Sequence, residues 1–145
     1  PMKRELWRRM SFNAICGNGD DHPRNHGVLL RHGSWGLAPA YDIAPYIRFS
    51  TTLAMHVTRE GHMSAARWGL LRDCETFEYQ QDEASAFIDH ATQVMQHTWE
   101  RERETLGFKP DDAPTPHPAS WLEEASPPGL KVRARRSSRA QRKTG

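Results

Sequence analysis

Three residues of this sequence, Asp20, Asn25 and Asp42, have side chains and a spacing suited to proton transfer and metal binding. They lie in one stretch, residues 17–42, which reads GNGDDHPRNHGVLLRHGSWGLAPAYD. Phosphoryl transfer needs a carboxylate that orients the attacking hydroxyl and accepts its proton, together with oxygen ligands that hold Mg²⁺. The stretch offers one carboxylate for the proton and two further oxygen-bearing side chains for the metal.

The spacing of these residues matches a known catalytic arrangement. In protein kinases the catalytic-loop Asp and a metal-binding Asn are separated by four residues, and a second metal-binding Asp follows later. Asp20 and Asn25 have that separation, and Asp42 lies where the later Asp would fall. The spacing therefore singles out Asp20, rather than Asp21, as the general base.

The elements around this stretch would bring its two ends together. Residues 3–16 have the spacing of a helix, and Gly17 ends it. Residues 26–30 and 35–37 read as two short strands joined by a turn, and Pro39 ends the second strand. This hairpin would return Asp42 to the loop that carries Asp20.

The same residues would also suit a purely structural turn or a zinc site. The run Gly17-Asn18-Gly19-Asp20 is strong turn chemistry, and a lone Asp in a turn usually bonds only local backbone. His22 and His26, with Cys16 nearby, could be part of a zinc site. Pro23 disfavours the regular helix that would align the two rings. The complete pattern favours the kinase-like site over both alternatives.

The segments FNAICGNGDDHPRNHGVLL and WGLAPAYDI together resemble the C-terminal lobe of HipA-like serine/threonine kinases. These kinases are the toxin partners of bacterial toxin–antitoxin pairs. The resemblance is dense from Leu6 to Ile43 and looser to about Leu106. Two differences from ordinary kinases, the missing His-Arg-Asp and Tyr-Asp-Ile in place of Asp-Phe-Gly, are features that the HipA-like family shows.

The resemblance implies a role for each residue of the site. Asp20 would be the catalytic base, and Asn25 and Asp42 would be the Mg²⁺ ligands. His22 and Tyr41 would line the ATP site. The implied cofactors are therefore ATP and Mg²⁺, and the implied reaction is phosphoryl transfer to a Ser or Thr hydroxyl of a protein.

The predicted fold is mainly α (α+β): a protein-kinase-like C-terminal lobe in which a small β-hairpin carries the active-site loop. Residues 51–57 are either a strand or an irregular segment. A helix from Ser64 to about Cys74 would bury Leu70, Leu71 and Cys74. The longest helix would run from Asp82 to about Leu106 and bury a stripe of apolar side chains at helical spacing: Ala84, Phe87, Ile88, Ala91, Met95 and Trp99.

The domain is predicted to cover residues 1–107, followed by a Pro-rich and then basic tail over 108–145. The segment from Lys131 to Gly145 has seven basic and no acidic residues, which leaves 13 basic against 18 acidic, or −5, in the rest of the chain. Such a tail is typical of disorder, and a solvated extension is favoured over contact with nucleic acid.

Composition excludes several classes of protein. No apolar run approaches the roughly 20 residues of a transmembrane helix, so no membrane association is expected. The two cysteines, Cys16 and Cys74, do not make a disulfide framework and are expected to be free thiols in a reducing, cytoplasmic setting. The five Trp are expected at the core or its edge.

Two functions compete. The first is a HipA-like kinase, with an antitoxin-type DNA-binding protein as a further partner. The second is a non-catalytic lobe that binds an antitoxin-like protein or nucleic acid. The sequence contains no Gly-rich phosphate loop and no Val-Ala-Ile-Lys lysine, which kinases place before the catalytic loop. We therefore expect this chain by itself to have little or no kinase activity.

Overall fold

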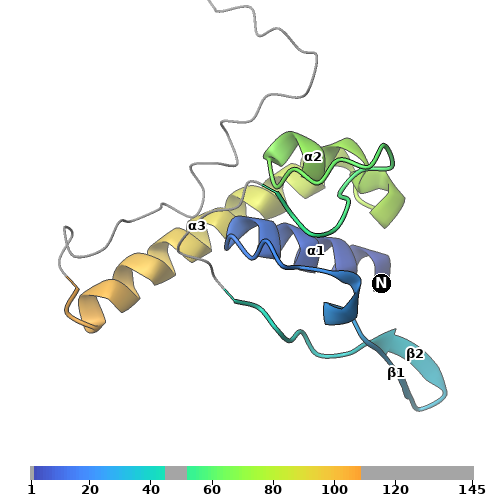
Figure 1. The fold of residues 1–145 in the computed structure, drawn as a ribbon, viewed down its shortest axis with the longest axis horizontal. Coiled ribbons are helices and arrows are strands. Elements are labelled where there is room, and N and C mark those ends of the chain that lie inside the picture. The colour runs from blue at the N-terminus through green and yellow to red at the C-terminus, as the bar shows by residue number, and fades with distance from the viewer. Residues whose placement is uncertain (1, 45–51, 109–145) are drawn as a thin grey trace, which may run out of the picture.

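The computed structural model describes residues 2–44 and 52–108. It combines three α-helices, two short 3₁₀ helices and a two-stranded antiparallel hairpin, which is compatible with an α+β class. In chain order these elements are α1 (Met2–Ile15), η1 (Pro23–Asn25), β1 (Val28–Arg31), β2 (Ser34–Leu37), α2 (Arg67–Arg72), η2 (Cys74–Phe77) and α3 (Gln81–Thr105). The three helices pack together and the hairpin projects away from them (Figure 1). None of the described helices is long and apolar enough to cross a membrane.

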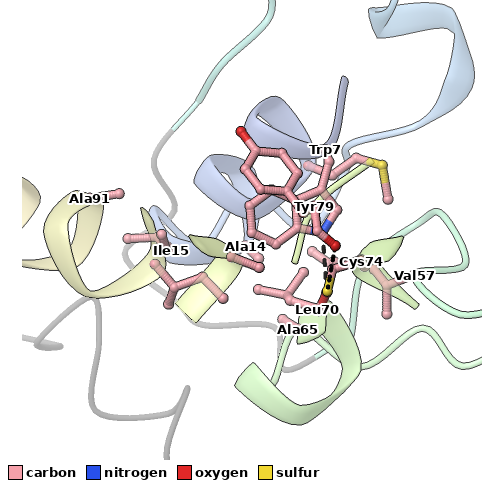
Figure 2. Packing of buried hydrophobic residues seen from close by; sticks show 13 residues of the cluster. Trp7, Ala14, Ile15, Val57, Ala65, Leu70, Cys74, Tyr79 and Ala91 are labelled. Atoms are coloured by element: carbon pink, nitrogen blue, oxygen red, sulfur yellow. Dashed lines mark hydrogen bonds between the residues drawn. The ribbon is translucent and has the colours of Figure 1, made fainter. Parts of the chain in front are cut away.

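The core forms where α1 meets α3 and the segment before it. The predicted inner face of α1 is confirmed, because Trp7, Met10 and Ala14 are all buried. The Trp7 ring lies 4.6 Å from the Tyr79 ring, centroid to centroid, and its indole N–H donates to the carbonyl of Leu70 at 3.1 Å. Figure 2 shows these side chains meeting at the centre of the cluster. Burial of an aromatic side chain with its polar atom satisfied is a large stabilising contribution.

The long helix α3 agrees closely with its prediction. The backbone N–H of Gln80 donates to the carboxylate of Glu83, as in a capping box. Ala84, Ile88 and Ala91 are buried in the core, and the helix ends just before Gly107, whose φ of 74° suits glycine. The remaining apolar positions of the stripe, Phe87, Met95 and Trp99, are partly buried.

The middle helix differs from its prediction. α2 begins at Arg67 rather than Ser64, and Ala66 occupies the N-cap position. The hydroxyl of Ser64 instead accepts a hydrogen bond from the N–H of Ala66 at 3.2 Å, which fixes the turn before the helix. Leu70 and Cys74 are buried as predicted, although Cys74 belongs to η2, whereas Leu71 is only partly buried. The apolar spacing predicted the buried side correctly, but did not show where α2 gives way to a 3₁₀ turn.

Other predicted elements also need correction. The first strand begins at Val28, two residues late, because His26 still belongs to the end of η1. In the described part of the predicted segment 51–57, the strand-like pairing is an isolated bridge between Thr52 and Ser64. Trp35 is 62% exposed on the hairpin, so it is not a core residue. The predicted tail lies outside the described residues, apart from Phe108.

The two cysteines are free thiols, as expected, and both are buried. Burial raises the pKa of both thiols, which keeps Cys16 and Cys74 in their protonated and unreactive form. They behave here as small apolar groups of the core.

Candidate active site

The loop that follows α1 holds the first part of the site. Gly17 takes a positive φ of 73° and ends the helix. The backbone N–H of Asn18 donates to the carbonyl of Asn13 at 2.9 Å, which turns the chain back along the last turn of α1. Asp20 follows with its side chain exposed. An exposed carboxylate on a loop tied to a helix end is accessible to a substrate.

Asn25 is buried at the end of η1, in contrast to Asp20. Its backbone N–H donates to the carbonyl of His22 at 2.9 Å. Its side-chain Nδ2 donates to the carbonyl of Asp20 at 3.4 Å. The amide nitrogen is thus directed at the Asp20 backbone, and the amide oxygen is the group left to bind a cation.

The hairpin returns the chain toward this loop. Val28 pairs with Leu37 and Arg31 with Ser34, so the turn consists of His32 and Gly33. Both turn residues have positive φ, 51° and 76°, as a two-residue type I′ turn requires. The ladder continues beyond the strands, because the N–H of Ala38 donates to the carbonyl of Gly27 at 2.8 Å.

Two side chains hold the start of the segment that follows β2. Arg9 of α1 donates from Nη1 to the carbonyl of Ala38 at 2.8 Å. The hydroxyl of Tyr41 donates to the carbonyl of Arg24 at 2.6 Å, which ties the segment to η1. Tyr41 was predicted to line the ATP site. Its hydroxyl is used in this contact, while the side chain remains 46% exposed.

A third contact reaches Asp42 itself. The side-chain Nδ2 of Asn18 donates to the carbonyl of Asp42 at 3.2 Å. Asp42 has a φ of 57°, in the left-handed region that residues other than glycine seldom adopt, although Asp and Asn adopt it more often than most. The structure thus ties the backbone of Asp42 to the loop that carries Asp20, while the backbone of Asp20 is tied to Asn25.

One pair in this loop was not identified from the sequence. The carboxylate of Asp21 is 1% exposed, and its Oδ1 lies 2.8 Å from Nε2 of His26. The pair spans η1 and so closes the segment that contains Asn25. The sequence offered the pattern Asp-x₄-His across a proline, but no periodicity shows that Asp21 points inward while Asp20 points outward.

The histidines that the structure describes do not form a recognisable metal centre. Within residues 2–44 and 52–108, no three His, Cys, Asp or Glu side chains lie together in a way that could hold a metal ion. Nδ1 of His22 is buried and has no hydrogen-bond partner in the described part of the chain. A role for His22 at the nucleotide stays a prediction.

The donor chemistry of Asn25 and Asp42 fits magnesium. Both offer hard oxygen atoms, and Mg²⁺ is commonly held by one or two carboxylates together with water and substrate phosphates. One carboxylate and one amide oxygen are a weak set by themselves. Metal affinity at this site should therefore depend on the phosphates of a nucleotide.

Comparison with known proteins places the chain in a family. The model of the HipA-like C-terminal domain family matches residues 1–99. A Sinorhizobium fredii protein named "Putative kinase Y4dM" is 35% identical over 65 residues, which cover 42% of this chain and 16% of that relative. The match thus spans about one sixth of the length of that relative. No solved structure matches the chain. The match over residues 1–99 shows that this chain belongs to the HipA-like C-terminal domain family.

Proposed function

We propose that this chain is the part of a HipA-like protein kinase that carries the catalytic base and the metal ligands. The reaction would be ATP-dependent phosphoryl transfer to a Ser or Thr hydroxyl of a protein. Family membership supports a relationship to such kinases. The observation that carries the proposal is the hydrogen bond from Asn18 to the carbonyl of Asp42, which joins two segments 24 residues apart.

Each residue of the site would have its own task. Asp20, exposed on its loop, would accept the proton of the attacking hydroxyl and hold that hydroxyl in line. Asn25 and Asp42 would hold Mg²⁺ through oxygen atoms, and the ion would neutralise charge on the phosphates when bound. His22 and Tyr41 would lie beside the nucleotide.

The backbone of Asp42 is a second feature in favour of a functional site. Residues held in sparsely populated backbone regions occur preferentially at active sites, where the surrounding structure over-determines them. Asp42 is one of three non-glycine residues with positive φ in the described chain, together with His32 and Glu78. His32 lies in the hairpin turn and Glu78 ends η2, so local turn geometry accounts for those two.

The setting of the reaction is a further part of the proposal. A bacterial cytoplasm would supply ATP and Mg²⁺, and an antitoxin-type DNA-binding protein would be the regulatory partner. Because the match covers only 16% of that relative, we propose that other parts of such a kinase grip the adenine and the phosphates. We therefore expect weak nucleotide binding and little phosphoryl transfer from this chain alone.

Calorimetric titration of Mg²⁺–ATP into the full chain tests the proposal. Binding should require Mg²⁺ and should fall at least about tenfold in Asp42→Asn, because a metal-binding carboxylate is lost. Asp20→Asn should leave binding nearly unchanged, because a general base acts on the hydroxyl. Glu100→Gln, which removes a carboxylate far along α3, is the matched control. Equal binding by wild type and Asp42→Asn, or none by wild type, would refute nucleotide binding at this site.

A second function, as a non-catalytic binding module, is favoured by the hairpin. Its apolar side chains are largely exposed: Val28, Leu29, Leu30 and Trp35. Contiguous exposed apolar residues often mark contact with another polypeptide. The basic segment that could contact nucleic acid lies outside the described residues. Phosphoryl transfer that depends on Asp20 would favour the kinase over this binding role.

A further inference from the structure

The side-chain amide of Asn18 bridges two parts of the chain that are far apart in the sequence, namely α1 and the segment that contains Asp42. Its side chain is 4% exposed. One acceptor of its Nδ2 is the side-chain oxygen of Asn13 on α1, at 3.2 Å, and the other is the carbonyl of Asp42, also at 3.2 Å. Both hydrogens of the amide are therefore used, one on the helix and one on the site.

Asn13 makes this arrangement rigid. It is 3% exposed, near the C-terminal end of α1, and its backbone carbonyl also accepts the N–H of Asn18. Two hydrogen bonds thus fix Asn18 to the helix before it reaches Asp42. Because the side chain of Asn18 is fixed to the helix, it can determine the position of the Asp42 carbonyl.

Asp42 is joined to the loop after α1 through this contact. Among the described residues, Asn18 is the one that donates a hydrogen bond to Asp42. Asp42 also holds the disfavoured backbone conformation, with φ of 57°. A disfavoured conformation persists only where its surroundings impose it.

We infer that Asn18 is a positioning residue, which holds the backbone of Asp42 in its left-handed conformation beside the loop that carries Asp20. Asn13 supports it from α1. The ligand-binding part of this inference rests on the proposed function, whereas the conformational part does not. No contact between Asn18 and substrate is involved.

The conformational part is tested by NMR on the full chain. The three-bond coupling between the amide and α protons of Asp42 reports φ, and ¹⁵N relaxation reports the order of the backbone. Asn18→Ala should change the coupling of Asp42 and lower its order, while signals from α3 stay unchanged. An unchanged coupling and unchanged order at Asp42 would overturn the inference. Asn18→Asp, which keeps the shape but replaces the donor by an oxygen, should act in the same direction and serves if Asn18→Ala does not fold.

The ligand part is tested by calorimetry with Mg²⁺–ATP. Asn18→Ala should weaken binding at least tenfold. Thr58→Val is the matched control, because Thr58 is also buried and its hydroxyl bonds His62 at 2.8 Å, away from the site. An equal loss of affinity in Thr58→Val would mean that lowered stability is the cause, and would overturn the inference. If wild type does not bind Mg²⁺–ATP, the proposed function fails, and the coupling of Asp42 still decides the role of Asn18.

Discussion

The helical core and the site region are held together by different forces. In the core, apolar side chains such as Trp7 and Ile88 are almost completely buried, with 2% and 0% of their surface exposed. Around the site, side-chain donors bind backbone carbonyls, as Arg9 binds Ala38 and Asn18 binds Asp42. Apolar burial is non-directional and tolerates small shifts, whereas these hydrogen bonds fix particular backbone atoms. The core therefore supplies stability and the polar contacts supply geometry.

The strongest test of this contrast uses one residue type in both regions. Trp7→Ala should lower the free energy of unfolding by about 3–5 kcal/mol, as is usual for a buried Trp. Trp35→Ala should change it by less than about 0.5 kcal/mol, because 62% of that side chain is exposed on the hairpin. Urea unfolding followed by circular dichroism measures both. Similar losses from the two variants would show that the hairpin is part of the core.

A second test compares two neighbouring carboxylates. Asp21→Asn should cost about 1–3 kcal/mol of stability, because it disturbs a buried hydrogen bond to His26. Asp20→Asn should leave stability within about 0.5 kcal/mol, since Asp20 is exposed. Thermal or urea unfolding of the two variants at equal concentration gives the comparison. A larger loss from Asp20→Asn would contradict the assignment of Asp20 to the site and Asp21 to the structure.

The smallest expected effect concerns the ion pair of Arg4 with Glu83, whose side chains approach to 2.7 Å. The hydrogen bond from Arg4 lowers the pKa of Glu83 below the ordinary value of 4.5. A lowered folded-state pKa contributes stability that is present above the unfolded pKa and is lost as pH falls through the folded value. Wild type should therefore have a slightly higher urea midpoint than Glu83→Gln at pH 7.

The difference should shrink as the pH falls below about 4.5 and at high salt, because the pair is partly exposed and is screened. A midpoint difference that stays constant into acid would mean that the charge of Glu83 is not the source. Arg4 also stacks on the ring of Tyr79, 3.9 Å from its centroid, and this packing should persist in Glu83→Gln.

The same contrast explains what the sequence could predict. The buried faces of α1 and α3 follow from spacing, since Trp7, Met10 and Ala14, and likewise Ala84, Ile88 and Ala91, recur at helical intervals. The hairpin was predicted because turn residues and a proline bound it, although its first strand begins two residues late. The expectation that Trp35 lies at the core or its edge was wrong, because residue type alone does not show that a strand projects from the domain.

The polar contacts of the site could not be predicted in the same way. Motif spacing identified Asp20, Asn25 and Asp42 as candidates, but not the burial of Asp21 or the bond from Asn18 to Asp42. These contacts join side chains to backbone atoms of distant residues, and such atoms carry no sequence signal. The start of α2 was missed for a related reason, since the hydroxyl of Ser64 bonds the turn before the helix.

The most direct test of the central claim, that Asp20, Asn25 and Asp42 surround one metal–nucleotide site, is paramagnetic broadening by Mn²⁺ in place of Mg²⁺. Mn²⁺ with ATP should broaden the NMR signals of residues 18–25 and 41–43 in the full chain, and spare those of the C-terminal half of α3. The broadening should disappear in Asp42→Asn and persist in Glu100→Gln. Broadening that reaches the 18–25 loop but not Asp42, or that survives Asp42→Asn, would contradict a shared site.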